Sequence, residues 1–214
     1  IEAGFGDWHK RDLKSFLTAC ERYGRQAKTQ VYKAVSEETG KTEGQVRAYF
    51  KVFWERFKEV AEWPKILDRI EKGERRIERN QAIERALKIK VARHKNPWQT
   101  LRLQYGSNKG KAFTEEEDIF LVCKMNEIGY GNWSELKIAV RQAWQFRFDW
   151  FIKSRTPTEL QRRCETLVRL VEKENEEYEA RRKAEAKAGK AKAGGKSGGN
   201  SQKKRSAPGS DAKK

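Results

Sequence analysis

The side chains in this sequence that could do chemistry are mostly basic, and the chemistry that suits them is the binding of phosphate. From Lys137 to Arg169 eight Lys and Arg residues stand against three acidic ones, Asp149, Glu159 and Glu165. Lys and Arg side chains bind polyanions by displacing the counterions that surround phosphate groups. This stretch is therefore a local cationic patch with a predicted role in binding a polyanion.

Catalytic chemistry has little support in the sequence. There are only two histidines, His9 and His94, and no His or Cys pair has the spacing of a metal site. The chain also has no glycine loop of the phosphate-cradling type and no nucleophile elbow. We therefore expect a binding module rather than an enzyme, with no catalytic residue, no cofactor and no metal.

The excess of positive charge is unevenly distributed along the chain. The 48 Lys and Arg residues exceed the 31 Asp and Glu residues by 17, and residues 181–214 alone contain 12 basic residues against two acidic ones. This last segment has no aromatic or branched apolar residue, so it cannot bury enough surface to offset the cost of ordering. We predict a disordered basic tail over 181–214 that holds +10 of the net +17.

A strongly basic chain points either to nucleic acid or to an anionic membrane surface. No apolar run approaches the length of a membrane span, and the first residues lack the pattern of a signal peptide. We therefore expect no membrane partner. The three cysteines, Cys20, Cys123 and Cys164, lie far apart within apolar helical patterns, which favours buried thiols in a reducing compartment over a disulfide.

The apolar residues recur at intervals of three and four, which predicts an all-α fold. An internal repeat organises these predicted helices. Trp8, Asp12, Phe16, Cys20 and Gly24 align at an offset of 105 with Phe113, Glu117, Leu121, Met125 and Gly129; the offset then grows to 114 and pairs Thr42, Val46, Phe50 and Phe53 with Thr156, Leu160, Cys164 and Leu167. The sequence thus predicts two copies of a three-helix unit, the second with nine extra residues before its third helix.

A long charged helix is predicted between the two copies, over residues 65–95. Its thin apolar stripe suits packing on one side, so we expect a spacer, roughly 45 Å long at 1.5 Å per residue, that holds the two units at a fixed separation. Gly73 is predicted to be the weakest point of this helix, and Asn96-Pro97 should end it. The charges of the spacer could equally face solvent or contact DNA.

The second copy carries three short motifs: Phe113-Thr114-Glu115-Glu116-Glu117-Asp118, Gly131-Asn132-Trp133-Ser134-Glu135-Leu136 and Arg155-Thr156-Pro157-Thr158-Glu159-Leu160-Gln161-Arg162-Arg163-Cys164. This unit resembles the Myb repeat, with Phe113 and Cys164 in place of two of the three family tryptophans. The first copy keeps Trp8 but has Lys28 and Phe50 at the other two positions, as in SANT domains. Together with the aromatic insert of residues 144–154, the order of the units is similar to the SANT-SLIDE region of ISWI chromatin-remodelling ATPases.

The resemblance implies two Myb/homeodomain-like units: a SANT unit over 4–62 and a SLIDE unit over 98–178, with the spacer and the tail as bounded above. It further implies a nuclear accessory module that binds linker or extranucleosomal duplex DNA with little sequence specificity, beside a separate ATPase motor. The alternative is a protein-interaction scaffold for histone tails or remodeller accessory subunits.

The third helix of the second copy is expected to carry the main DNA contacts. If Leu160, Cys164 and Leu167 face the core, then Arg162, Thr166 and Arg169 lie on the opposite side and can meet phosphate. Further candidates are Arg155, Lys153, Arg147, Arg141, Lys137, Lys111 and Lys109. Arg155 could equally be a plain solvent-exposed residue, and Lys109 and Lys111 could instead offset the acidic residues that follow them. For Arg163, the resemblance implies a structural ion pair with Glu117.

Two other segments have alternative interpretations. The aromatic insert is either a satellite core beneath a long loop or a protein-binding patch, and the first interpretation is favoured. The third helix of the first copy is so apolar that we expect it to pack against the spacer and to have little DNA affinity of its own.

Overall fold

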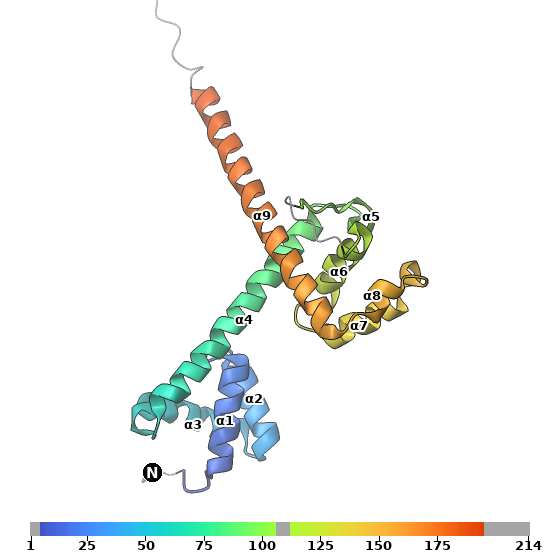
Figure 1. The fold of residues 1–214 in the computed structure, drawn as a ribbon. Helices are drawn as coiled ribbons and strands as arrows, with labels where there is room; N and C mark the ends of the chain where they lie inside the picture. Colours follow the sequence, from blue (N-terminus) through green and yellow to red (C-terminus); the bar gives the residue numbers. More distant parts are fainter. Residues whose placement is uncertain (1–4, 106–111, 195–214) are drawn as a thin grey trace, which may run out of the picture.

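The computed structural model describes residues 5–105 and 112–194, and every regular element in these two ranges is helical. The predicted all-α class is confirmed. Two three-helix units lie against different parts of one long helix, α4, as Figure 1 shows. No helix in the described ranges has the length and apolar character required to cross a membrane.

The first unit precedes α4 and has an aromatic core. Its helices are α1 (Lys10–Tyr23), α2 (Lys28–Thr39) and α3 (Glu43–Arg56), followed by the short turn η1 (Phe57–Glu59). Phe16 lies at the centre, with edge-on contacts to Tyr49, Phe50 and Phe53 of α3. The side chains of Thr42 and Gln45 form a capping box at the start of α3. This reciprocal capping satisfies backbone donors that the first turn of a helix leaves free.

The second unit follows α4 and repeats the same order of helices with an insertion. It contains α5 (Pro97–Thr100), α6 (Glu115–Ile128), α7 (Trp133–Gln142), η2 (Trp144–Phe146), α8 (Trp150–Ser154) and α9 (Pro157–Gly194). Helices α6 and α7 begin 105 residues after α1 and α2, and α9 begins 114 residues after α3. A capping box between Thr114 and Glu117 opens α6. The repeat in the sequence therefore has the same offsets as the repeat of helices.

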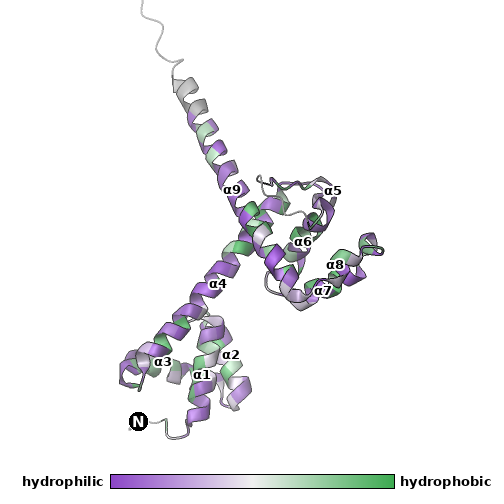
Figure 2. Ribbon diagram, in the orientation of Figure 1, coloured by the Kyte–Doolittle hydropathy of each residue, from purple (hydrophilic) through white to green (hydrophobic). Residues whose placement is uncertain are grey.

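Helix α4 (Trp63–Ala92) is shared by both hydrophobic cores. Ile70 belongs to the core of the first unit, whereas Ile83 and Leu87 are buried in the core of the second. Figure 2 shows green apolar residues interspersed among purple polar ones along this helix. The two ends of one rigid helix are thus anchored in different cores, which sets the separation of the units by helix length.

The packing of α4 on the first unit differs in part from what the sequence suggested. Its main partner there is α1, and α3 contributes chiefly Phe53 and Trp54, which line an apolar pocket with residues of α4 such as Ile66 and Ile70. The expectation that the third helix packs on the spacer is therefore only partly correct. The reason is a close approach between α4 and α1.

Gly73, which the sequence suggested as the weakest point of the helix, makes this close approach possible. A Cβ atom at this position would lie 2.2 Å from the carbonyl oxygen of Glu21 and 3.0 Å from its carbonyl carbon. The missing side chain lets the backbones of α1 and α4 meet. Beside it, Arg25 binds Glu74 through two guanidinium nitrogens, and Arg69 pairs with Glu21.

The longest helix, α9, crosses α4 in the upper half of Figure 1. At the crossing the buried Lys90 ammonium donates to a carboxylate oxygen of Glu174 and, at 2.6 Å, to the carbonyl oxygen of Arg102. The second oxygen of Glu174 accepts from the backbone N–H of Gln104 at 2.5 Å. Because every charge here has several partners, the pair can be buried without leaving an unsatisfied ion.

Helix α9 continues further than the sequence suggested. Residues 181–194 continue it to Gly194, so the boundary predicted at 181 is too early for the end of the helix. This segment consists mainly of Ala, Lys and Arg, which have a high intrinsic propensity for helix. Residues 195–214 of the predicted tail lie outside the described residues.

Substituting Gly73→Ala should destabilise the docking of α4 on the first unit by about 1–3 kcal/mol, because the new methyl group meets backbone atoms that cannot rotate away. Gly44→Ala is the matched control, since its Cβ would meet nothing closer than the Thr42 hydroxyl at 4.0 Å and Ala favours helix. Urea denaturation followed by circular dichroism measures both. Equal stability of the two variants would contradict the proposed close packing.

The three cysteines should resist alkylation in the folded protein. Burial raises the pKa of the Cys20 and Cys164 thiols to about 12 and that of Cys123 to about 11. Only the thiolate reacts, so modification by iodoacetamide at pH 8 should be at least about 100-fold slower than for an exposed thiol. All three should react in urea. Fast labelling in native buffer, detected by mass spectrometry, would rule out this environment.

Candidate nucleic-acid interface

The N-terminal half of α9 has two chemically different faces. Leu160, Cys164 and Leu167 are fully buried in the second core, as their spacing predicted. Arg162, Thr166 and Arg169 are exposed on the opposite side. Within the described part of the chain, neither of these two arginines forms an ion pair. On the side opposite the core, helix α9 therefore presents two guanidinium groups that have no ion pair among the described residues.

The neighbouring Arg163 has the structural role that was expected, but with a different partner. Its guanidinium donates to both carboxylate oxygens of Asp118, at 2.8 and 2.5 Å, and not to Glu117. Glu117 instead folds back to accept from the backbone N–H of Thr114. A turn of about 100° per residue then directs the next side chain of α6, Asp118, towards α9.

Asp118 is completely buried, and two side chains satisfy it. Besides Arg163, the Tyr105 hydroxyl donates to it at 2.8 Å. The hydrogen bonds to Asp118 raise the pKa of the Arg163 guanidinium, and burial together with the bond to Asp118 raises that of Tyr105. Both effects favour the protonated forms that donate to the carboxylate. This cluster holds α9 and α6 in register and so fixes the direction of the exposed arginines.

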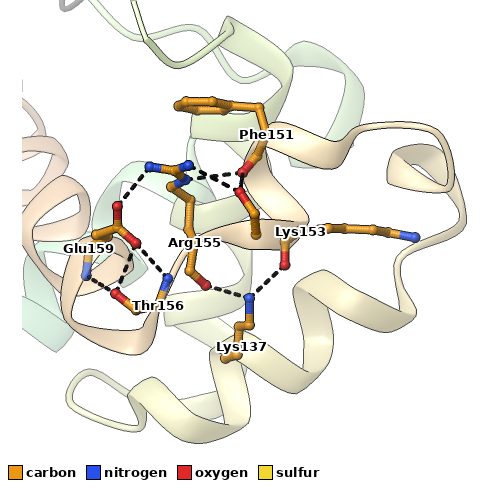
Figure 3. Close-up of polar contacts among 7 residues, drawn as sticks. Lys137, Phe151, Lys153, Arg155, Thr156 and Glu159 are labelled. Carbon is orange, nitrogen blue, oxygen red and sulfur yellow. Dashed lines mark hydrogen bonds and ion pairs between the residues drawn. The ribbon is translucent and has the colours of Figure 1, made fainter.

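Lys137 is occupied by the protein itself. Its ammonium donates to the carbonyl oxygen of Lys153 at 2.7 Å and also to that of Arg155, as Figure 3 shows. Burial, followed by the nearby positive charge of Arg141, lowers the pKa of Lys137. The side chain thus closes the C-terminal end of α8 by binding its free carbonyls. In the same view the side chain of Lys153 points away from this network.

Arg155 is also held by neighbours. Its guanidinium donates to Glu159 at 2.7 Å and to the carbonyl of Phe151 at 3.1 Å, and it lies over the Phe151 ring (Figure 3). Glu159 in turn accepts from Thr156 at the start of α9. These contacts, together with those of Lys137, determine where the third helix begins. Two of the predicted DNA contacts, Lys137 and Arg155, thus help to position α9 in the structure.

The other cationic candidates of this unit lie on α7 and on the insert. Arg141, at the end of α7, is exposed and has no ion pair among the described residues. Arg147 is exposed between two aromatic rings, 4.2 Å from the centroid of Trp144 and 4.7 Å from that of Phe148. Lys109 and Lys111 lie outside the described residues.

The insert forms a satellite core only in part. Phe146 and Ile152 are buried, but Trp144, Phe148 and Trp150 are exposed by 74%, 79% and 81%. The favoured interpretation of the insert as a satellite core therefore does not hold for these three rings. Buried and exposed positions are equally apolar here, so the sequence contains no periodic signal that separates them.

The first unit also has exposed cations, among them Lys10, Arg11 and Lys14 of α1. Arg47 lies over the Tyr32 ring and Arg56 is paired with Glu59 at 2.7 Å, whereas Lys51 and Lys58 are exposed. Across the two described ranges, no group of three or more His, Cys, Asp and Glu side chains could hold a metal ion. We take the second unit as the candidate interface because Arg162 and Arg169 lie together on the exposed face of its third helix.

Adjacent arginines of α9 should respond differently to substitution. Arg163→Ala leaves the buried carboxylate of Asp118 without its ion-pair partner and should cost about 3–5 kcal/mol of unfolding free energy. Arg162→Ala is the control: it removes the same charge from an exposed position and should change stability by no more than about 0.5 kcal/mol. Chemical denaturation distinguishes them. A similar cost for both substitutions would refute the assignment of separate roles.

Comparison with known proteins agrees with this division into units. The SLIDE family model matches residues 64–175, more than half of the chain. A "Probable chromatin-remodeling complex ATPase chain" of Oryza sativa is 52% identical over 179 residues, which cover 84% of this chain and 16% of that protein. An ISWI chromatin-remodeling complex ATPase of Arabidopsis thaliana is 51% identical over 181 residues, covering 85% of this chain and 17% of the relative.

A similar match extends to animals. A human protein named SWI/SNF-related matrix-associated actin-dependent regulator of chromatin subfamily A member 1 is 48% identical over 190 residues, which cover 87% of this chain and 18% of that protein. The chain thus spans less than a fifth of the length of these relatives. With a SLIDE match over most of the region from α4 to α9 and relatives near 50% identity, the chain belongs to the SLIDE family and corresponds to the SANT-SLIDE region of ISWI-type chromatin-remodelling ATPases.

Proposed function

We propose that this region is a non-catalytic, DNA-binding module of a nuclear ISWI-type nucleosome remodeller. It binds linker or extranucleosomal duplex DNA through phosphate, with little sequence specificity, and helps the remodeller to position or space nucleosomes. The names of the relatives, which describe chromatin-remodelling ATPases, support the setting. The main support for the DNA contact is that Arg162 and Arg169 lie on the exposed face of α9 and form no ion pair among the described residues.

The arrangement favours contact with the DNA backbone. Guanidinium groups bind phosphate through two N–H donors at once. The Thr166 hydroxyl lies between the two arginines and donates to the backbone carbonyl of Arg162 at 3.1 Å, so in this arrangement the arginines are the phosphate donors. Arg141, Arg147 and Lys153 would extend the contact from α9 across the insert. Recognition of specific bases needs a set of amide or arginine side chains that face a DNA groove. The side-chain amide of Gln161 instead donates to the carboxylate of Glu165. We therefore assign most of the affinity to phosphate.

Helix α4 gives the module its length. Because this helix is anchored in both cores, the first unit would stand at a defined distance from DNA bound on α9. We infer that Lys137 and Arg155 support this surface from behind and are not its main contacts, since their side chains already bind protein groups. Lys109 and Lys111, which lie outside the described residues, remain candidate contacts.

The double substitution Arg162→Ala and Arg169→Ala should weaken DNA binding and flatten its salt dependence. Each phosphate contact contributes about 0.9 to the slope of log K against log salt, so the slope should fall by about two. A fluorescently labelled linker duplex titrated at several salt concentrations measures both quantities. The control is Lys51→Ala with Lys58→Ala, which removes two exposed charges from the first unit. Equal losses in both variants would overturn the assignment to α9.

The basic C-terminal segment requires a separate experiment, because it carries much of the net charge. Deleting residues 195–214 leaves α9 intact and should lower the overall affinity for DNA while preserving the effect of the α9 substitutions. If all DNA binding vanished with these residues, the folded units would instead act as a protein scaffold.

A further inference from the structure

The exposed rings of the insert are unusual for a soluble helical unit. Trp144, Phe148 and Trp150 are exposed by 74–81%, whereas no other large hydrophobic side chain in the described ranges exceeds the 54% of Ile138. Single exposed apolar residues are normal, but several large aromatic rings gathered on one short segment mark an interaction site. With Arg147, which lies against two of the rings, these residues form what we call the aromatic cluster.

The aromatic cluster is held on a fixed support. Phe146 and Ile152 anchor the insert in the second core, and Phe146 contacts Phe120 of α6 edge-on. Asp149 caps α8 by accepting from the backbone N–H of Ile152 at 3.2 Å. The exposure of the rings therefore does not come from a loosely packed loop. Rings presented on a rigid frame lose little conformational entropy when they bind a partner.

The chemistry of the aromatic cluster matches the centre of a protein interface. Trp, Phe and Arg are enriched in such centres and provide most of the binding energy. The bases of duplex DNA, in contrast, are stacked and offer no surface to such rings unless the duplex is unstacked at a cost of a few kcal/mol per step. These observations favour a protein over DNA as the occupant.

The charges around the aromatic cluster define the partner further. Arg147 lies against two of the rings, Lys153 belongs to the same insert, and Arg141 precedes the insert by three residues. The one carboxylate among residues 144–154, Asp149, is used in capping α8. A complementary partner must be acidic as well as apolar. The chain's own segments 106–111 and 195–214 contain mostly Lys, Gly and Ser with no aromatic residue, so they do not fit this description.

We propose that the aromatic cluster docks an acidic amphipathic segment of a partner protein, whose apolar side chains cover the rings and whose carboxylates meet Arg147 and its basic neighbours. The main DNA contacts proposed above, Arg162 and Arg169, lie on α9 and not on the insert. DNA and the acidic partner would therefore share only Arg147 and its basic neighbours, where the proposed DNA contact extends across the insert.

The test uses the full chain and three labelled synthetic 20-residue helical peptides. One has Leu and Phe on one face and Glu on the other; the second has Lys for Glu; the third has Ser for the apolar residues. Binding is followed by fluorescence polarisation, and affinity for a linker duplex is measured in parallel. The variants are a triple one, Trp144→Ser, Phe148→Ser and Trp150→Ser, and a charge reversal, Arg147→Glu. The control is Ile89→Ala, at an exposed apolar residue of α4.

We expect saturable binding of the acidic amphipathic peptide alone. The triple variant should weaken it at least about tenfold, as for the loss of interface hot spots. Arg147→Glu should weaken it as well and favour the Lys peptide, while Ile89→Ala changes nothing. The DNA affinity of the triple variant should stay within about twofold of the original. Retained thermal stability would exclude misfolding as the cause.

Three results would overturn the proposal: no saturable binding of any peptide, equal binding of the acidic and basic peptides, or undiminished binding by the triple variant. A loss of DNA affinity in the triple variant without peptide binding would assign the aromatic cluster to the DNA surface instead. The duplex titration and the peptide titration are independent measurements. A negative peptide result therefore does not contradict the proposed DNA contact of α9, and a negative DNA result does not contradict the proposed docking on the aromatic cluster.

Discussion

Helix α9 has to pack against two different partners along one continuous face, and this requirement organises the molecule. Leu160, Cys164 and Leu167 fill the core of the second unit, and two turns further along Glu174 and Asn175 bind α4. A helix is rigid over these distances, so its orientation in the core and its crossing of α4 must be satisfied together. The face with Arg162 and Arg169 is the one left exposed once α9 has packed in the second core and against α4.

The crossing itself depends on a buried ion pair. Burying Lys90 and Glu174 carries a desolvation cost that their attraction offsets only because a backbone carbonyl and a backbone N–H complete their hydrogen bonding. Apolar residues could supply comparable stability, but they would allow the helices to slide. An ion pair with directed partners selects one register. We infer that its contribution lies in fixing the angle between α4 and α9.

The basic side chains of this protein therefore fall into two classes. Arg163, Arg155, Lys137 and Lys90 bind groups of the protein and hold elements in place, whereas Arg162, Arg169 and Arg141 have no ion pair among the described residues. The net charge does not distinguish these two classes. The side chains that bind protein groups determine where the unpaired ones point. Because the first turn of α9 and Arg163 are held in place, the helix presents its exposed face in one orientation.

Much of the architecture follows from local pattern. The three-and-four spacing and the repeat offsets of 105 and 114 were sufficient to predict helices, their order and the long connecting helix, because each rests on the order and spacing of residues along the chain. The inner and outer faces of α9 were predictable for the same reason. The SANT-SLIDE resemblance likewise rests on short motifs in a fixed order.

Only the tertiary structure could decide how distant residues meet. It gave Arg163 the partner Asp118 because Glu117 was already used in capping α6, and it turned Gly73 from an expected weakness into the contact point of α1 and α4. It also separated the rings of the insert into buried and exposed sets with no periodic signal. Such outcomes depend on competition between partners far apart in the sequence. A local pattern states what each residue can bind, and the packed structure determines which of the possible partners is within reach.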